Sequence, residues 1–126
     1  MTSSIRPLVA GNWKMNGTSA SMPELVAIGH AFTHGFDVPV EALICPPATL
    51  LARAYDVLSS SAVRVGGQDC AVSENGAHTG DISAEMLKDA GASFVIVGHS
   101  ERRTDHGETN QIVNEKAQAA WRAGLV

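Results

Sequence analysis

Phe94-Val-Ile-Val-Gly-His-Ser-Glu-Arg-Arg103 is the stretch that decides the predicted fold. Four apolar residues, three of them β-branched, precede a glycine, an imidazole, a hydroxyl, a carboxylate and two guanidinium groups. A short run that is apolar at every position predicts a strand buried on both faces, as in a parallel sheet. Since open α/β sheets and βα-barrels hold ligands at the carboxyl ends of their strands, we expect a functional site at His99.

Similar apolar runs alternate along the chain with stretches whose apolar residues recur at helical spacing. The expected strands cover 7–14, 41–45, 63–68 and 93–97, and the expected helices cover 22–36, 50–58, 84–90 and the residues after Thr109. Strict alternation of this kind indicates βα units, right-handed crossovers and a parallel sheet, which is the α/β class. The polar connection 69–81 is longer than most βα loops, and ordered loops of that length are usually functional.

The helix boundaries carry recognisable signals. Pro23 suits the first turn of the first helix, while Ser83 and Thr109 are candidate N-caps of later ones. The apolar faces are predicted from spacing: Leu25, Ile28 and Phe32 on the first helix, and Val113, Ala117, Ala120, Trp121 and Gly124 on the last. Leu125 and Val126 then read as the start of a fifth strand, so we expect residues 1–126 to be part of one larger domain.

Composition excludes several classes of protein. The chain of 126 residues has a net charge of −4 and no basic tract, so nucleic acid is not an expected partner. No stretch approaches the roughly 20 apolar residues of a membrane span. Two cysteines, Cys45 and Cys70, do not make a disulfide framework and favour a reducing, cytoplasmic setting.

Three residues are candidates for polar chemistry at the end of the sheet. His99 is either a structural histidine or a catalytic one. A short helical turn is expected over 100–103, and the partial positive charge at its N-terminus disfavours the cationic form of His99. A neutral imidazole can donate a hydrogen bond to a carbonyl oxygen. Lys14 is either a solvated surface residue or a cation for an anionic substrate. Asn12 lies two positions before Lys14, so on an extended chain both side chains would point the same way.

Other polar residues point to fewer functions. Glu101 and Glu108 are candidate acid–base groups, or simply ion-pair partners of Arg102 and Arg103. His30 and His34 have the i, i+4 spacing of metal ligands without a third ligand nearby, so no metal site is expected. The chain has neither a Walker A loop nor a GxGxxG motif, so no nucleotide cofactor is indicated.

Together, four segments resemble the triosephosphate isomerase family. They are Ala10-Gly-Asn-Trp-Lys-Met-Asn16, Gly66-Gly-Gln68, Gly76-Ala-His-Thr-Gly80 and Val95-Ile-Val-Gly-His-Ser-Glu-Arg-Arg103 with Gly107-Glu108. The resemblance implies a (β/α)8 TIM barrel, here only its first four βα units. It also implies the interconversion of dihydroxyacetone phosphate and glyceraldehyde 3-phosphate, a step of glycolysis and gluconeogenesis, without a cofactor.

The resemblance also implies roles for individual residues. Lys14 and His99 would be catalytic. His99 would be the electrophile that polarises the carbonyl, and a neutral imidazole in that role is already known for this family. Asn12, Lys14, Ser100 and Glu101 would bind the substrate, a small phosphorylated triose. Thr79 would reach the partner's site from the dimer loop of a homodimer.

The family's general base is a glutamate after the sixth strand, and its phosphate-binding loops follow the seventh and eighth. None of these falls within residues 1–126, and a barrel of this type needs about 250 residues. We therefore expect residues 1–126 alone to be inactive. The alternative is a half-barrel that binds or assembles without catalysis, and the reading frame beyond codon 126 would discriminate between the two.

Overall fold

A four-stranded parallel sheet organises the structure, a computed structural model that describes residues 5–126. The strands are β1 (Leu8–Asn12), β2 (Glu41–Cys45), β3 (Val63–Gly67) and β4 (Phe94–Val95), paired in the order β1-β2-β3-β4. The helices are η1 (Ser19–Ser21), α1 (Met22–Ala31), α2 (Ala48–Leu58), α3 (Ala84–Asp89), α4 (Ser100–His106) and α5 (Asn110–Arg122). The four units form half of a βα-barrel, as predicted.

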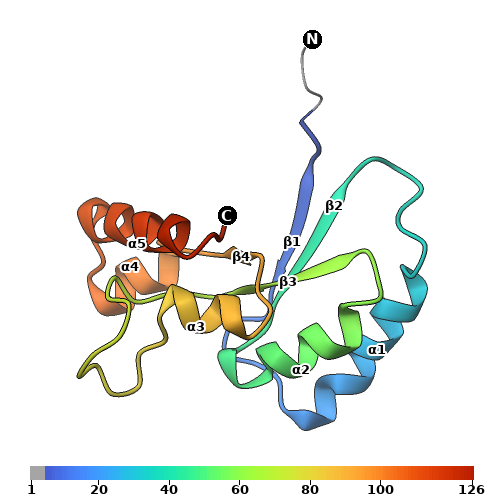
Figure 1. Cartoon of the computed structure of the whole chain (residues 1–126), viewed down its shortest axis with the longest axis horizontal. Helices are drawn as coiled ribbons and strands as arrows, with labels where there is room; N and C mark the ends of the chain where they lie inside the picture. Colours follow the sequence, from blue (N-terminus) through green and yellow to red (C-terminus); the bar gives the residue numbers. More distant parts are fainter. Residues whose placement is uncertain (1–4) are drawn as a thin grey trace.

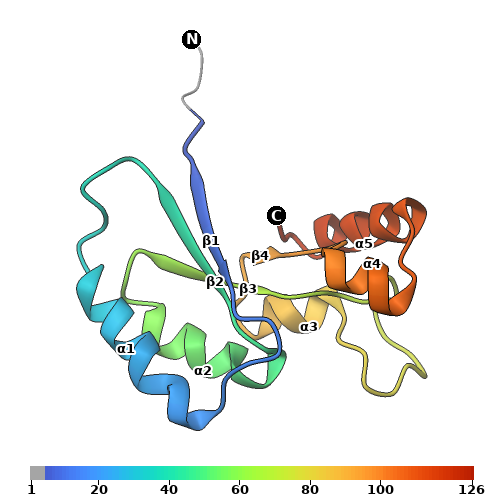
Figure 2. The ribbon, with the colours of Figure 1, turned by 180° about the vertical axis from the view of Figure 1, so that it is seen from behind.

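Helices cover one face of the sheet only. Figures 1 and 2 show α1 and α2 along the outer side of β1–β3, with α3 and α5 beside β4. The core lies between these layers, where Ile44 and Val65 of the strands meet Leu51 and Leu58 of α2. The other face is open, and it is the face that would point into a closed barrel.

The two edge strands are the least buried part of the sheet. On β1, Leu8 and Val9 are 43% and 61% exposed. The expectation that residues 94–97 are buried on both faces is wrong, since all four are only half-buried. The reason is that one face of the whole sheet is open and that β4, as an edge strand, has only Val126 along its free edge.

The backbone of Val126 runs beside β4. Its N–H donates to the Ser93 carbonyl at 3.1 Å, and its carbonyl accepts from the Val95 N–H at 3.0 Å. This is the bonding pattern of a parallel bridge opposite Phe94. Val126 is thus bonded to β4 as a neighbouring strand would be, whereas the Leu125 N–H still donates to the Ala120 carbonyl of α5.

Three predicted elements extend at least two residues beyond their observed ends. The first strand ends at Asn12 because Lys14 adopts a positive φ of 56°, which no strand accommodates. The first helix ends at Ala31, not residue 36, because Phe32 leaves helical geometry and Gly35 is left-handed. Strand β4 has two residues instead of five, although the N–H of Ile96 still donates to the Gly67 carbonyl.

The predicted helix starts are confirmed. The hydroxyl of Ser83 accepts from the Met86 N–H, and that of Thr109 accepts from the Ile112 N–H. The predicted face of the last helix is wrong in two members, because Trp121 is 66% exposed and Gly124 is exposed beyond the end of the helix. Of the predicted residues only Ala120 is fully buried, and Lys116 and Ala119 are buried beside it.

Candidate active site

The first part of the site is the turn that follows β1. The Lys14 N–H donates to the side-chain oxygen of Asn12 at 2.9 Å. The premise that both residues sit on an extended chain is wrong, because Lys14 is left-handed. The turn nevertheless keeps Asn12 and Lys14 together at the carboxyl end of the strand, with the lysine side chain 57% exposed.

Glu101 links the residues that follow the two edge strands, β1 and β4. One of its carboxylate oxygens contacts the Lys14 ammonium, and the other contacts Nδ1 of His99. The expectation that Glu101 pairs with Arg102 or Arg103 is therefore wrong. Its position in the first turn of α4 directs it toward β1 instead. An ammonium and an imidazole thus converge on a single carboxylate.

The charge on Glu101 follows from these contacts. The hydrogen bond from Lys14 holds the pKa of the Glu101 carboxyl below its usual value, and the neighbouring His99 acts in the same direction. A carboxylate of lowered pKa is a weak proton acceptor. Glu101 is therefore suited to orienting the two groups rather than to acting as the general base. Ser100, the first residue of α4, is exposed beside it.

Gln68, directly after β3, joins the same end of the sheet. Its Nε2 donates to the carbonyl of Lys14 at 2.8 Å and to the carbonyl of Cys45 at 2.9 Å. Sequence reasoning assigned no role to this residue, although it belongs to one of the quoted motifs. Its place directly after the glycine pair Gly66-Gly67 is the only signal that could have been used.

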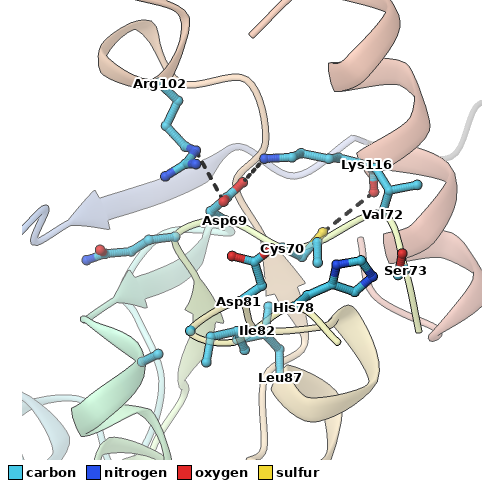
Figure 3. A pocket seen from close by; sticks show the side chains of 14 residues that line it. Asp69, Cys70, Val72, Ser73, His78, Asp81, Ile82, Leu87, Arg102 and Lys116 are labelled. Carbon is cyan, nitrogen blue, oxygen red and sulfur yellow. Dashed lines mark hydrogen bonds and ion pairs between the residues drawn. The ribbon is translucent and has the colours of Figure 1, made fainter. Parts of the chain in front are cut away.

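A cluster of four charged side chains holds α4 and α5 against the chain that follows β3. Its members are Asp69, Arg102, Glu108 and Lys116. Lys116 on α5 lies 2.9 Å from both Asp69 and Glu108, and Arg102 on α4 lies 3.1 Å from Asp69 and 2.5 Å from Glu108. Figure 3 shows Arg102 and Lys116 reaching Asp69 from two different helices. The predicted pairing of Glu108 with Arg102 is confirmed. Lys116 was missed, although its spacing on the apolar face of α5 could have revealed it.

The charge cluster is partly buried, and its hydrogen bonds outweigh the desolvation of Glu108 and Lys116. Desolvation alone would raise the pKa of Glu108, but hydrogen bonds from Lys116 and Arg102 outweigh it and hold that pKa below its usual value. For Lys116, desolvation would lower the pKa, yet Asp69 and Glu108 raise it. The Lys116 and Glu108 side chains are only 9% and 5% exposed. Lys116 and Glu108 are therefore charged at neutral pH, and the cluster holds α4, which His99 directly precedes.

A cavity of about 500 Å³ lies beside the charge cluster. Figure 3 shows its wall, to which the connection 69–83 contributes Cys70, His78 and Asp81. That connection is closed at its neck by the Ala71 N–H, which donates to the Ile82 carbonyl at 2.8 Å. Thr79 belongs to this connection and is exposed.

Neither cysteine is available as a nucleophile. Cys45 and Cys70 are free and buried. Burial raises the pKa of each thiol to about 11, so both stay protonated at neutral pH. Within residues 5–126, no three histidine, cysteine, aspartate or glutamate side chains are grouped as metal ligands would be.

Comparison with known proteins decides the family. The family model described as triosephosphate isomerase matches residues 7–126. The chain belongs to the triosephosphate isomerase family. It is 64% identical over its whole length to the triosephosphate isomerase of Mesorhizobium japonicum, covering 49% of that protein. It is also 64% identical to that of Bartonella bacilliformis, covering 50% of it.

A solved triosephosphate isomerase confirms the fold. The crystal structure of the Bartonella henselae enzyme is 56% identical and superimposes with a TM-score of 0.86, over 97% of this chain and 50% of that one. The chain thus spans about half the length of the curated relatives it matches. In the part that the structure describes, no helix has the length and apolar character needed to cross a membrane.

Proposed function

We propose that this chain is the N-terminal half of a single TIM-barrel domain whose whole protein is a triose-phosphate isomerase. It would interconvert dihydroxyacetone phosphate and D-glyceraldehyde 3-phosphate through an enediolate. The observation that carries the proposal is the convergence of Lys14 and His99 on Glu101. These groups follow β1 and β4, the two edge strands, so only the curvature of the sheet brings them together.

The geometry suits an isomerisation by proton transfer. Removing a proton from the carbon beside a carbonyl leaves negative charge on the carbonyl oxygen, and that charge needs a hydrogen-bond donor or a cation. His99 would donate to this oxygen, and the Lys14 ammonium would bind the phosphate and the developing oxyanion. Asn12, Ser100 and Glu101 would complete the substrate-binding surface.

The proposed isomerisation also requires a general base. Moving a proton between neighbouring carbons needs a base but no metal or redox cofactor. The base of this family is a glutamate that follows the sixth strand and belongs to the second half of the barrel. General-base help alone is worth roughly 10²–10⁴-fold, so residues 1–126 by themselves would turn over very little.

The partner we propose is a second copy of the whole protein. The connection 69–83 carries exposed apolar side chains, with Val72 and Ile82 39% and 37% exposed, and Met86 on the following helix is 52% exposed. A partner surface would cover them and would receive Thr79 at its own site. We place the protein in the cytoplasm, since its cysteines are unpaired.

A chimeric enzyme tests the proposed function. Residues 1–126 would replace the matching half of the Bartonella henselae enzyme, which supplies the other four βα units. We expect the chimera to isomerise glyceraldehyde 3-phosphate, and residues 1–126 alone to be inactive. A chimera that folds cooperatively but shows no turnover would favour the alternative, a half-barrel that binds or assembles without catalysis.

A further inference from the structure

Lys14 is held in a backbone conformation that costs energy. Among residues 5–126 it is the only residue other than glycine with a positive φ, at 56°. For a residue with a Cβ, the left-handed region is disfavoured because the Cβ lies too close to the following carbonyl oxygen. Such a conformation persists only where neighbouring groups determine it. The direction of the lysine side chain depends on it, because the backbone sets where Cβ points.

Side-chain amides bind both backbone polar groups of Lys14. Its N–H donates to Asn12, two residues away, at 2.9 Å. Its carbonyl accepts from Nε2 of Gln68, 54 residues away, at 2.8 Å. The first contact is local and moves with the turn. Only the second ties the strained peptide to another strand.

Gln68 is itself well anchored. Its Nε2 also donates to the carbonyl of Cys45, which accepts from the Trp13 N–H at 3.0 Å as well. Cys45 is completely buried at the end of β2. The next residue, Asp69, is bound by Lys116 and Arg102. The amide that holds Lys14 is therefore fixed by the sheet on one side and by two helices on the other.

We propose that Gln68 is a positioning residue for Lys14: its side-chain amide holds the lysine's left-handed backbone so that the ammonium meets Glu101 and the substrate. This inference rests on the proposed function for its kinetic consequence, but not for its structural one. Without the amide, the Lys14 carbonyl loses its donor, the strained conformation loses its main long-range support, and the cation becomes less well placed.

The structural consequence is measurable without catalysis. The measurement uses the chimera described above, in which residues 1–126 contribute three lysines, at 14, 88 and 116. Lysine-selective ¹⁵N labelling limits the spectrum to lysine backbone signals, and the loss of one signal in Lys14→Met assigns that of Lys14. A positive φ shortens the distance from a residue's own amide proton to its Hα. We expect a strong intraresidue amide–Hα NOE for Lys14 in the parent chimera and a weak one in Gln68→Met, which keeps the side-chain length but removes the donor.

The kinetic consequence is measured in the chimera described above. We expect Gln68→Met to raise KM for glyceraldehyde 3-phosphate on the order of tenfold and to change kcat much less, because a misplaced cation weakens binding of the phosphate. Gln118→Met is the matched control. It removes a donor from the exposed face of α5, where Gln118 binds Asn114, and should change neither the NOE nor KM. If Gln68→Met does not fold, Gln68→Asn shortens the reach while keeping the amide.

The possible outcomes separate the two proposals. An unchanged NOE for Lys14 and an unchanged KM in a folded Gln68 variant would overturn the positioning role. A loss of kcat with no change in KM, or an equal rise of KM in the Gln118 control, would overturn it too. If the parent chimera is inactive, and its strong Lys14 NOE still becomes weak in Gln68→Met, the positioning role is supported while the isomerase proposal is refuted.

Discussion

His99 and Lys14 show how individual residues divide the proposed chemistry. His99 follows a glycine at the end of β4 and directly precedes α4, while Lys14 follows β1. Glu101 contacts both. One group would act on the carbonyl and the other on the phosphate and oxyanion, so their substitutions should have different kinetic effects.

Replacing His99 should affect the chemical step. In the chimera, His99→Gln is expected to lower kcat by about 10²–10⁴-fold, since a glutamine cannot exchange a proton with the substrate oxygen. KM should change little, and the urea unfolding midpoint should stay near that of the parent. Near-parental turnover in a folded variant would refute the role given to His99.

Replacing Lys14 should affect binding as well. Lys14→Met removes the cation and keeps the length of the side chain, so we expect a higher KM and a fall in kcat of about 10²–10³-fold. Steady-state kinetics over a range of salt concentrations give the measurement. The parent's KM should rise with salt and the variant's should not, because screening acts on the lost charge. Equal salt dependence in both would argue against Lys14 as the phosphate ligand.

At the scale of elements, the charge cluster of Asp69, Arg102, Glu108 and Lys116 decides how α4 and α5 are held. Glu108→Gln leaves two cations facing Asp69 alone and should lower the free energy of unfolding at pH 7 by about 3 kcal/mol. The pKa of Glu108 is held below its usual 4.5. Its stabilising contribution is therefore full above that pH and is lost as the pH falls through the lowered pKa.

The pH dependence gives the control for this prediction. Urea unfolding between pH 3 and 7 should show a steeper loss of stability in the parent than in Glu108→Gln, which has no such carboxylate to protonate. Glu115→Gln, on the exposed side of α5, should behave like the parent. Parallel pH curves for all three proteins would mean that the cluster contributes no net stability.

The junction of α2 and α3 depends on a single glycine. Gly91 has φ of 110°, and a Cβ there would lie 2.3 Å from Cγ of Tyr55. Gly91→Ala should lower the unfolding free energy by about 3 kcal/mol, from backbone strain and overpacking together. Gly124 also has a positive φ, but a Cβ added there would meet no atom within 4 Å. Gly124→Ala should therefore show the destabilisation from backbone strain alone. A thermal or urea denaturation series separates the two contributions.

For the whole molecule, the open edges predict self-association. Within residues 5–126, β1 has no neighbouring strand on one side, and β4 is paired on its free edge only by Val126. Unpaired parallel edges with exposed apolar residues such as Val9 associate with other chains. Sedimentation velocity of residues 1–126 should therefore show oligomers or aggregates. A single sharp monomer boundary together with cooperative unfolding would contradict this.

Much of the architecture could be predicted from local patterns. The strands, the capped starts of α3 and α5, and the alternation that indicates a parallel sheet all depend on short-range spacing. The end of β1 could not be predicted, because the left-handed Lys14 is stabilised by Gln68, 54 residues away. The exposure of 94–97 was equally hidden, since an apolar run does not reveal whether its strand is at an edge.

The sequence by itself determined the family, the βα order and the identity of Asn12, Lys14 and His99 as site candidates, because these depend on motifs and periodicity. Only the tertiary structure decided that Glu101 joins Lys14 to His99, that Gln68 holds the Lys14 peptide, and that Lys116 is buried among carboxylates. The physical reason is that these contacts form between side chains on different strands and helices. Their distances follow from the curvature of the sheet and the packing of α4 and α5, which no local pattern encodes.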